Sequence, residues 1–328
     1  RHGLGYSRLT GKKDGIEVKM HMKVAGPPDG YPLLVLPWGG YEVDYFRPYF
    51  HGVEEFCRVY YVRLPQVEDF KGLARDPKSN SVVYPSKTLA LGLADIMKES
   101  GPEKFGVLAH GPWSGILGMM VAANNQERVS HLVLINPRSA GAAYTNSIEN
   151  VRREGLRTGN KEMSKGADGI SIMEDGNPKY KPSDGAEHEG MNRALNNLEY
   201  GDPTEPETGS LGYYYRLPGG VQQTNDQSWS MKAIFAGKKT DFPVLIFMGM
   251  KSVWTPIPDM RMVSGLFKRA TVAEMPESSE TPFISETYLF TKHLEKFFKG
   301  AKLPKPKDTA QEKDKDKGKS KGKTKVGG

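Results

Sequence analysis

Two polar side chains near residue 112, a histidine and a serine, are of types that could carry chemistry. His110 follows the apolar run 105–109, which indicates a strand, and Ser114 falls in the first turn of the helix expected next. A serine hydroxyl becomes a nucleophile when a neighbouring base accepts its proton and a third group orients that base. No carboxylate adjoins His110 in the sequence, and Ser114 suits the amino terminus of a helix. A hydrogen-bonded imidazole and a small helix residue are the simpler interpretation.

The remaining reactive residue types do not gather into a cofactor site. The single Cys57 excludes an internal disulfide, and its place at the start of an apolar run indicates a core thiol. The seven histidines show neither HxH nor HxxxH spacing. We therefore expect no metal and no cofactor.

The sequence around this turn resembles a known family. The stretch His110-Gly-Pro-Trp-Ser-Gly115 leads into a helix ending in Gln126-Glu-Arg-Val129, and an apolar strand follows. This resembles the nucleophile elbow of α/β-hydrolases, closest to the proline iminopeptidase branch, whose elbow reads Gly-Gly-Ser-Trp-Gly-Ser before a helix ending in Pro-Glu-Arg-Val. Trp38 and Gly39 resemble part of the family's oxyanion loop, which the position of Trp113 would complete. The resemblance covers residues 15–137 and 240–299 and implies the α/β-hydrolase fold.

In the gap-free register of this resemblance, Pro112 stands where the family has its nucleophilic serine. Proline has no side-chain oxygen or sulfur to attack a substrate. Its φ is locked near about −65°, so it cannot hold the strained backbone of an elbow. A shift by one residue brings Gly111 to the position, and glycine is equally inert.

The resemblance also locates the positions of the acid and the base. Residues 249–256 resemble Gly-x-x-Asp-x-x-x-Pro with Ser252 at the Asp position, and residues 275–282 resemble the histidine loop with Glu280 at the His position. Without the histidine there is no base, and without the aspartate nothing orients one. Pro112, Ser252 and Glu280 are thus interpreted as a degenerate triad that converges at the carboxyl edge of the sheet. Asp259 is interpreted as a residue that begins a helix.

Strands alternate with helices on both sides of a long irregular stretch. Expected strands cover residues 31–37, 58–64, 105–109, 131–135, 242–249 and 271–275, and expected helices cover 44–56, 86–100, 113–125, 260–268 and 284–299. This order predicts an α/β fold, a mostly parallel sheet with helices on both faces. Residues 138–239, rich in Gly, Asn, Asp, Glu and Pro, predict an irregular cap-like insertion with candidate helices at 147–154 and 189–198. The core then comprises residues 1–137 and 240–300, and a low-complexity tail covers 301–328.

The net charge lies in this tail. Residues 302–328 hold ten Lys against four acidic residues and so carry six of the seven formal positive charges. Such a composition favours disorder unless a partner orders it, and the expected partners are other protein subunits or RNA phosphates. The anchoring residues would be Lys313, Lys315, Lys317, Lys319, Lys321, Lys323 and Lys325. The longest apolar stretch is broken at His110-Gly-Pro, so no membrane span is expected.

Three functions follow from these observations. The missing triad favours a catalytically inactive protein, not an enzyme, that serves as a structural or docking subunit of a larger assembly and is anchored in part by its tail. One alternative is a hydrolase or small-molecule binder with a non-standard site that uses Ser114, His110 or Glu280. A second alternative is an RNA-associated subunit of a ribonucleoprotein. The start without Met indicates a trimmed chain, for which a mitochondrial or other organellar location, otherwise a cytoplasmic one, is expected.

Overall fold

A single sheet organises the computed structural model, which describes residues 7–13, 16–37, 46–65, 70–71, 86–140, 143–161, 163–165 and 230–300. The nine strands in these residues are β1 Ser7–Lys13, β2 Ile16–Ala25, β3 Tyr31–Leu36, β4 Cys57–Arg63, β5 Phe70–Lys71, β6 Phe105–His110, β7 Val129–Ile135, β8 Pro243–Gly249 and β9 Arg269–Met275. Their order is β1-β2-β4-β3-β6-β7-β8-β9, with β5 beside β2. All pairs from β4 to β9 are parallel, and the pairs of β2 are antiparallel. The predicted mostly parallel sheet is confirmed.

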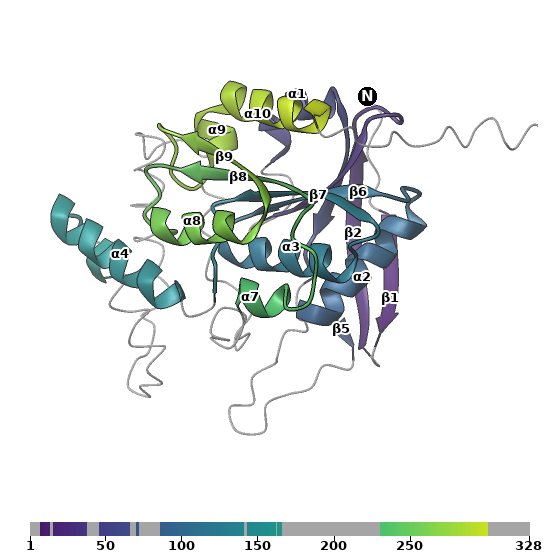
Figure 1. Ribbon diagram of the computed structural model, residues 1–328, viewed down its shortest axis with the longest axis horizontal. Helices are drawn as coiled ribbons and strands as arrows, with labels where there is room; N and C mark the ends of the chain where they lie inside the picture. Colours follow the sequence, from purple (N-terminus) through teal and green to yellow (C-terminus); the bar gives the residue numbers. More distant parts are fainter. Residues whose placement is uncertain are drawn as a thin grey trace, which may run out of the picture.

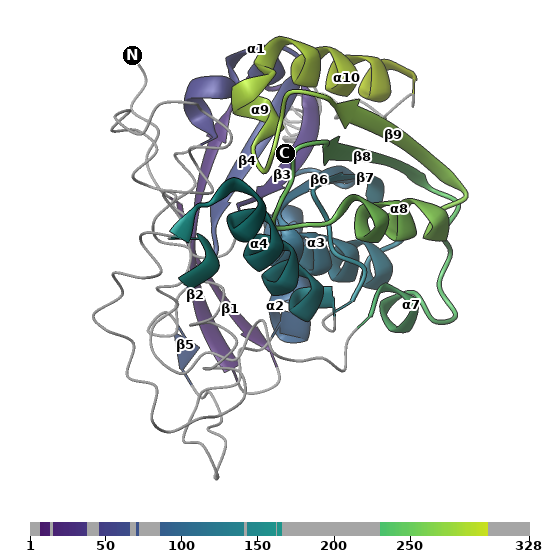
Figure 2. The same cartoon turned by 90° about the vertical axis from the view of Figure 1, so that its left-hand side faces the viewer.

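Helices cover both faces of this sheet (Figure 1). One face carries α2 Ser86–Glu99, α3 Pro112–Asn124, α7 Met231–Ile234 and α8 Ile257–Leu266. The opposite face carries α1 His51–Glu54, α9 Pro282–Ser285 and α10 Thr287–Gly300, with the 3-10 helix η2 Arg47–Tyr49 leading into α1. The helix α4 Ala143–Thr158 lies to one side of the sheet in Figure 1 and faces the viewer in Figure 2.

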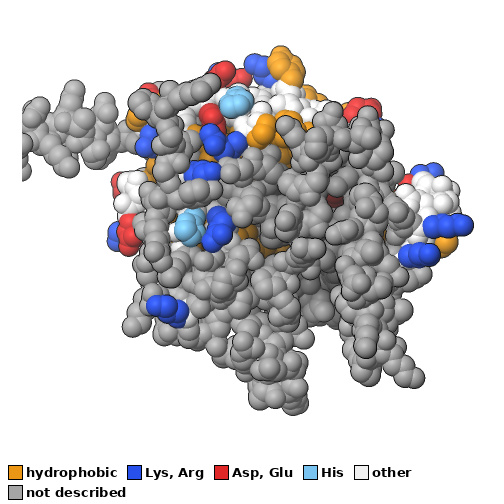
Figure 3. Space-filling view, turned by 180° about the vertical axis from the view of Figure 1, so that it is seen from behind, with side chains coloured by type: hydrophobic (Ala, Val, Ile, Leu, Met, Phe, Trp, Pro, Cys, Tyr) orange, Lys and Arg blue, Asp and Glu red, His pale blue; other side chains and the backbone are white. Residues whose placement is uncertain are grey.

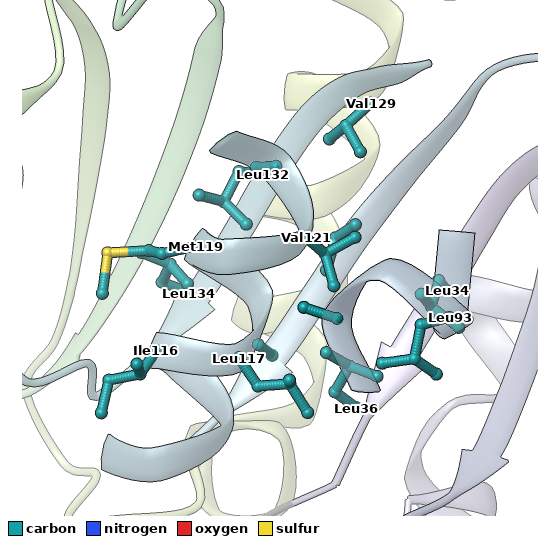
Figure 4. Packing of buried hydrophobic residues seen from close by; sticks show 14 of the residues in the cluster. Leu34, Leu36, Leu93, Ile116, Leu117, Met119, Val121, Val129, Leu132 and Leu134 are labelled. Atoms are coloured by element: carbon teal, nitrogen blue, oxygen red, sulfur yellow. The ribbon is translucent and has the colours of Figure 1, made fainter. Parts of the chain in front are cut away.

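The central strands are buried because helices sandwich them. Every residue of β6 is buried, and two separate hydrophobic clusters fill the two faces of the sheet. On the α3 face, Leu117 points from the helix toward Leu36 of β3 (Figure 4), and Ile116 and Leu134 belong to the same cluster. Each such side chain contributes about 1.5–3 kcal/mol by leaving water. The sheet centre is therefore a firm base for the loops at its carboxyl edge.

The described elements differ from expectation in three places. The helix expected at 44–56 is in its described part the short η2 and α1, because Pro48 fits only the first turn of a helix. The helix expected at 284–299 is divided into α9 and α10 at Glu286, whose φ of −132° is not helical. The strands β1, β2 and β5 were not expected. The alternation of Met20, Met22 and Val24 with polar residues was the signal for β2.

A long segment separates β7 from β8, although these strands are neighbours in the sheet. An isolated antiparallel bridge joins Ala140 to Ser230 at its base. The candidate helix 147–154 lies within α4, and the candidate helix 189–198 lies outside the described residues. The boundaries predicted for the insertion stay a prediction.

His131 on β7 provides a test of how a buried polar ring affects stability. The residue is buried, and neither ring nitrogen has a hydrogen-bond partner among the described residues. The ring packs against Phe297 and Phe298, with centroids 5.5 and 6.0 Å away. Burial, together with the charge of Arg269, lowers the pKa of His131 to about 4.

Replacing His131→Phe is expected to raise the free energy of unfolding by about 1–2 kcal/mol, because it removes two unsatisfied nitrogens and keeps the aromatic packing. Since the folded pKa lies below the unfolded value, wild-type stability is lost as pH falls below about 6.5. The gain should therefore be larger at pH 5 than at pH 8 in urea unfolding. His131→Ala, which keeps neither ring nor nitrogen, should destabilise at pH 8. A destabilised phenylalanine variant would contradict this account.

Candidate functional site

The turn between β6 and α3 lies at the carboxyl edge of the sheet. Gly111 forms it with φ 85° and ψ 175°, and Pro112 is the first residue of α3. The Gly111 N–H donates to the Ile135 carbonyl over 2.8 Å. The positive-φ position therefore falls one residue earlier than the predicted Pro112, because only glycine adopts it without cost. Neither residue supplies a nucleophilic atom, and Pro112 has no N–H to offer an oxyanion.

The two polar residues that flank this turn are both occupied by structural contacts. Ser114 is buried and donates a hydrogen bond to the Pro37 carbonyl. His110 is also buried, between Phe46 and Phe283, and donates from Nε2 to the Glu280 carbonyl over 2.7 Å. Burial lowers the pKa of His110 to about 3, so its ring is neutral at neutral pH. Trp113 is buried in the first turn of α3, whereas Trp38 and Gly39 lie outside the described residues.

The positions assigned to the acid and the base lie in direct contact. The Ser252 hydroxyl donates to the Glu280 carboxylate over 2.6 Å, and the Trp254 N–H donates to it over 2.9 Å. Burial raises the pKa of Glu280, and these hydrogen bonds oppose the rise. Since its backbone also binds His110, Glu280 joins the loops after β6, β8 and β9. Its carboxylate binds the loop after β8, and its backbone carbonyl binds the last residue of β6.

Asn136, directly after β7, completes this connection. Its side-chain amide donates to the Glu280 carboxylate over 2.9 Å and to the Ser279 carbonyl over 2.7 Å. Its side-chain oxygen accepts from the Gly249 N–H over 2.9 Å. Asn136 has a φ of 46°, a conformation that asparagine tolerates better than most residues. The carboxyl ends of four neighbouring strands are thereby fixed to one another.

A second hydroxyl and carboxylate meet nearby, and the sequence did not indicate that they would. Asp259 lies in the first turn of α8, as expected, but its carboxylate accepts from the Ser139 hydroxyl and, over 3.1 Å, from the Ser139 N–H. Both residues are largely buried, at 8% and 5% exposure. Burial raises the pKa of Asp259, against the hydrogen bonds from Ser139 and the charge of Arg138. Their separation of 120 positions carries no sequence signal.

Solved structures of the same architecture identify the fold. No protein-family model matches the chain. An esterase from a Rhodococcus species superposes with a TM-score of 0.62 at 14% identity, covering 90% of this chain and 99% of that one. An α/β fold family hydrolase from Bacillus anthracis gives 0.59 at 18%, with 89% and 99% covered. A meta-cleavage product hydrolase from Pseudomonas fluorescens gives 0.57 at 18%, with 91% and 98% covered. The chain has the α/β-hydrolase fold; the proline iminopeptidase branch stays a prediction.

These comparisons contradict the expectation of an inactive docking subunit. The matched proteins are hydrolases, and this chain covers at least 98% of the length of each one described. The expectation that the chain is not an enzyme was therefore wrong. It assumed that an elbow without a nucleophile means that the protein has no catalytic activity. Ser139 and Asp259 form a hydroxyl–carboxylate pair at the same edge of the sheet. The hydrolase alternative fits better.

The predicted tail contacts, Lys313 to Lys325, lie outside the described residues. Binding of RNA or of other protein subunits through them stays a prediction, as does an organellar location. In the part of the chain that the structure describes, no helix has the length and apolar character needed to cross a bilayer.

Proposed function

We propose that the protein is a hydrolase of carboxylic esters that uses Ser139 as nucleophile and Asp259 as base, in place of a serine at the elbow. The observation that carries this proposal is the hydrogen bond from the Ser139 hydroxyl to the Asp259 carboxylate at the carboxyl edge of the sheet. The esterase of the same fold supports the choice of substrate class.

The pair has the arrangement that nucleophilic catalysis requires. One carboxylate oxygen accepts from the Ser139 hydroxyl, and the other is held by the Ser139 N–H. The Ser139 carbonyl in turn accepts from the Met231 N–H over 2.8 Å. A carboxylate whose pKa is raised by burial is a stronger base than one in water. The hydroxyl and its base are thus held in place before substrate arrives.

The place of the pair also suits the fold. Ser139 lies four residues after the end of β7. Pro137, which precedes it, packs against Gly115 in the first turn of α3: a β-carbon added at Gly115 would lie 3.4 Å from the proline ring. Ligands of open α/β sheets bind outside the carboxyl ends of the strands. The pair therefore lies at the edge of the sheet where a substrate is expected.

The reaction proceeds in two steps, acylation of Ser139 and hydrolysis of the acyl-enzyme. The Ser139 oxygen bonds to the ester carbonyl carbon while its proton passes to Asp259, and the alcohol leaves with that proton as the C–O bond breaks. Water then attacks the acyl-serine ester, gives a proton to Asp259, and releases the acid as the Ser139 oxygen takes the proton back. The positive charge of Arg138 acts on Asp259. It would also stabilise the negative charge that develops on the substrate during the attack.

Labelling with a fluorophosphonate probe tests the nucleophile without a known substrate. Attack by Ser139 would form a covalent phosphonate ester, so we expect one adduct per chain, located at Ser139 by peptide mass spectrometry. Ser114→Ala should label as the wild type does, because the Ser114 hydroxyl donates to the backbone carbonyl of Pro37, which is not a base that could activate it. An adduct at another residue would show that Ser139 is not the nucleophile, while the assignment of the protein as a hydrolase would stand. No adduct, together with no turnover of acetyl or butyryl esters, would refute the hydrolase.

A further inference from the structure

The Glu280 carboxylate accepts hydrogen bonds from both chain segments that carry the proposed hydroxyl–carboxylate pair. Its Oε1 accepts from the Trp254 N–H over 2.9 Å, and Trp254 lies five residues before Asp259. Its Oε2 accepts from the Asn136 side-chain amide over 2.9 Å, and Asn136 lies three residues before Ser139. One carboxylate is thus bonded to the chain before the nucleophile and to the chain before the base.

The connections from these contacts to the pair are short. Asn136 and Ser139 are separated by two residues, and both of these are buried. Trp254 and Asp259 are separated by four residues, and the Asp259 N–H donates to the Pro256 carbonyl over 3.0 Å as α8 begins. Both connections contain proline, which restricts the backbone further. A displacement at either contact with Glu280 is therefore expected to move one member of the pair relative to the other.

We propose that Glu280 is a positioning residue for the reaction. By binding both segments, it keeps the Ser139 hydroxyl at hydrogen-bond distance from the Asp259 carboxylate before substrate arrives. Glu280 makes no bond to the substrate and exchanges no proton in the reaction. This inference rests on the proposed ester hydrolysis, because it assigns to Glu280 the geometry of that pair.

Glu280 differs from acidic side chains at the surface. On the face seen in Figure 3, several acidic side chains of described residues lie at the surface beside Lys and Arg side chains. The pair of Lys251 and Glu277 is of this exposed kind, and such pairs hold neighbouring segments only weakly. Glu280 instead has neutral donors, and one of them comes from the fully buried Asn136. A bond between groups with so little freedom can define a position.

A glutamine at position 280 tests this role because it preserves size but not the second acceptor. The carboxylate accepts at Oε1 from the Ser252 hydroxyl and the Trp254 N–H, and at Oε2 from Asn136. Glutamine has one acceptor oxygen, so its NH2 group must face donors on one of the two sides. Glu280→Gln should therefore break one connection and lower kcat for a butyryl ester about tenfold to a hundredfold, with KM within about twofold, since a misplacement of about 1 Å can cost about a hundredfold in rate.

Glu286 provides the matched control. Like Glu280, it accepts from a serine hydroxyl and a backbone N–H, those of Ser278 over 2.5 Å and of Glu277 over 3.1 Å. Both bonds end on the same oxygen, Oε2, so the single oxygen of a glutamine can keep them. Glu286→Gln should keep kcat and KM within about twofold of the wild type.

A double variant separates positioning from a general loss of structure. In the Asp259→Asn background no base remains to be positioned, so adding Glu280→Gln should lower kcat by no more than about twofold. A loss of the same size in both backgrounds would overturn the proposal, because the effect would then not act through Asp259. An unchanged kcat in the single Glu280→Gln variant would overturn it as well. Circular dichroism checks that each variant is folded.

Ser252→Ala tests the same point if the glutamine variant does not fold. It removes one donor to Glu280 and should lower kcat severalfold, again without a further loss in the Asp259→Asn background. The site of the fluorophosphonate adduct separates this inference from the proposed function. An adduct at Ser139 combined with full activity of the variants would overturn the positioning role alone. An adduct at Ser252 would overturn both, because Glu280 would then be the base of a different nucleophile.

Discussion

Ser139→Ala is expected to lower kcat/KM for an ester substrate about a thousandfold or more, since it removes the atom that forms the acyl-enzyme. Asp259→Asn keeps the size of the side chain and removes the base, so a loss of about a hundredfold to ten-thousandfold is expected. Both losses should fall mainly on kcat, because neither substitution takes away a group that holds the remote part of a substrate. Initial rates over a range of substrate concentrations measure both constants.

The pH profile separates a catalytic Asp259 from a structural one. The base form prevails only above the pKa of the carboxyl, which burial raises, so wild-type activity should fall as pH decreases through that value. The residual activity of Asp259→Asn should not show this decrease at low pH. Ser264→Ala, whose hydroxyl donates to a carbonyl on the same helix α8, is the control and should keep wild-type rates. Unchanged rates in the Ser139 variant would assign hydrolysis to other residues.

Gly249→Ala is expected to destabilise the protein by about 4 kcal/mol or more, among the larger effects of a single substitution. An added β-carbon would lie 1.7 Å from the Ser279 carbonyl oxygen, a backbone atom that cannot rotate away. The Gly249 N–H also donates to Asn136, so any shift of the strand end breaks the connection among the loops. Urea unfolding measures the change.

The same substitution at Gly265 provides a matched control of opposite sign. Gly265 lies within α8, and no atom lies within 4 Å of an added β-carbon. Alanine is preferred to glycine in a helix by about 0.5–1 kcal/mol, so Gly265→Ala should stabilise slightly. Equal effects at both glycines would show that steric contact at Gly249 does not determine the outcome.

The core could be predicted from the sequence because its strands are continuous apolar runs. β6, β7 and β8 were found in this way, and their parallel pairing follows from the helices between them. The antiparallel β2 was missed although Met20, Met22 and Val24 alternate with polar residues, because only continuous apolar runs were interpreted as strands. Pattern reading thus finds buried strands more readily than half-exposed ones.

The site was harder to predict, for two physical reasons. The position of the turn was taken from a gap-free register at Pro112, although the fixed φ of proline already favoured Gly111 as the residue able to adopt 85°. The contact between Ser139 and Asp259 depends on how α8 packs against β8 and β9, which brings Asp259 to the residues that follow β7, and no local pattern encodes this. Asp259 could be recognised as a helix-start residue, but its partner could not.

Ala140 and Ser230 are joined by a bridge, so the stability of the core depends only weakly on how many residues lie between them. Bridged residues in an antiparallel pair lie about 4.5–5.5 Å apart, a gap that a tight turn can span. The entropic cost of closing a loop rises by only about 0.6 kcal/mol for each doubling of its length. Insertion, removal or exchange of residues between these two positions, apart from those of α4 that pack against the core, therefore costs little entropy of loop closure. Ser139 and Met231 adjoin the bridge, so each such exchange would vary the surroundings of the proposed nucleophile while the scaffold stays constant.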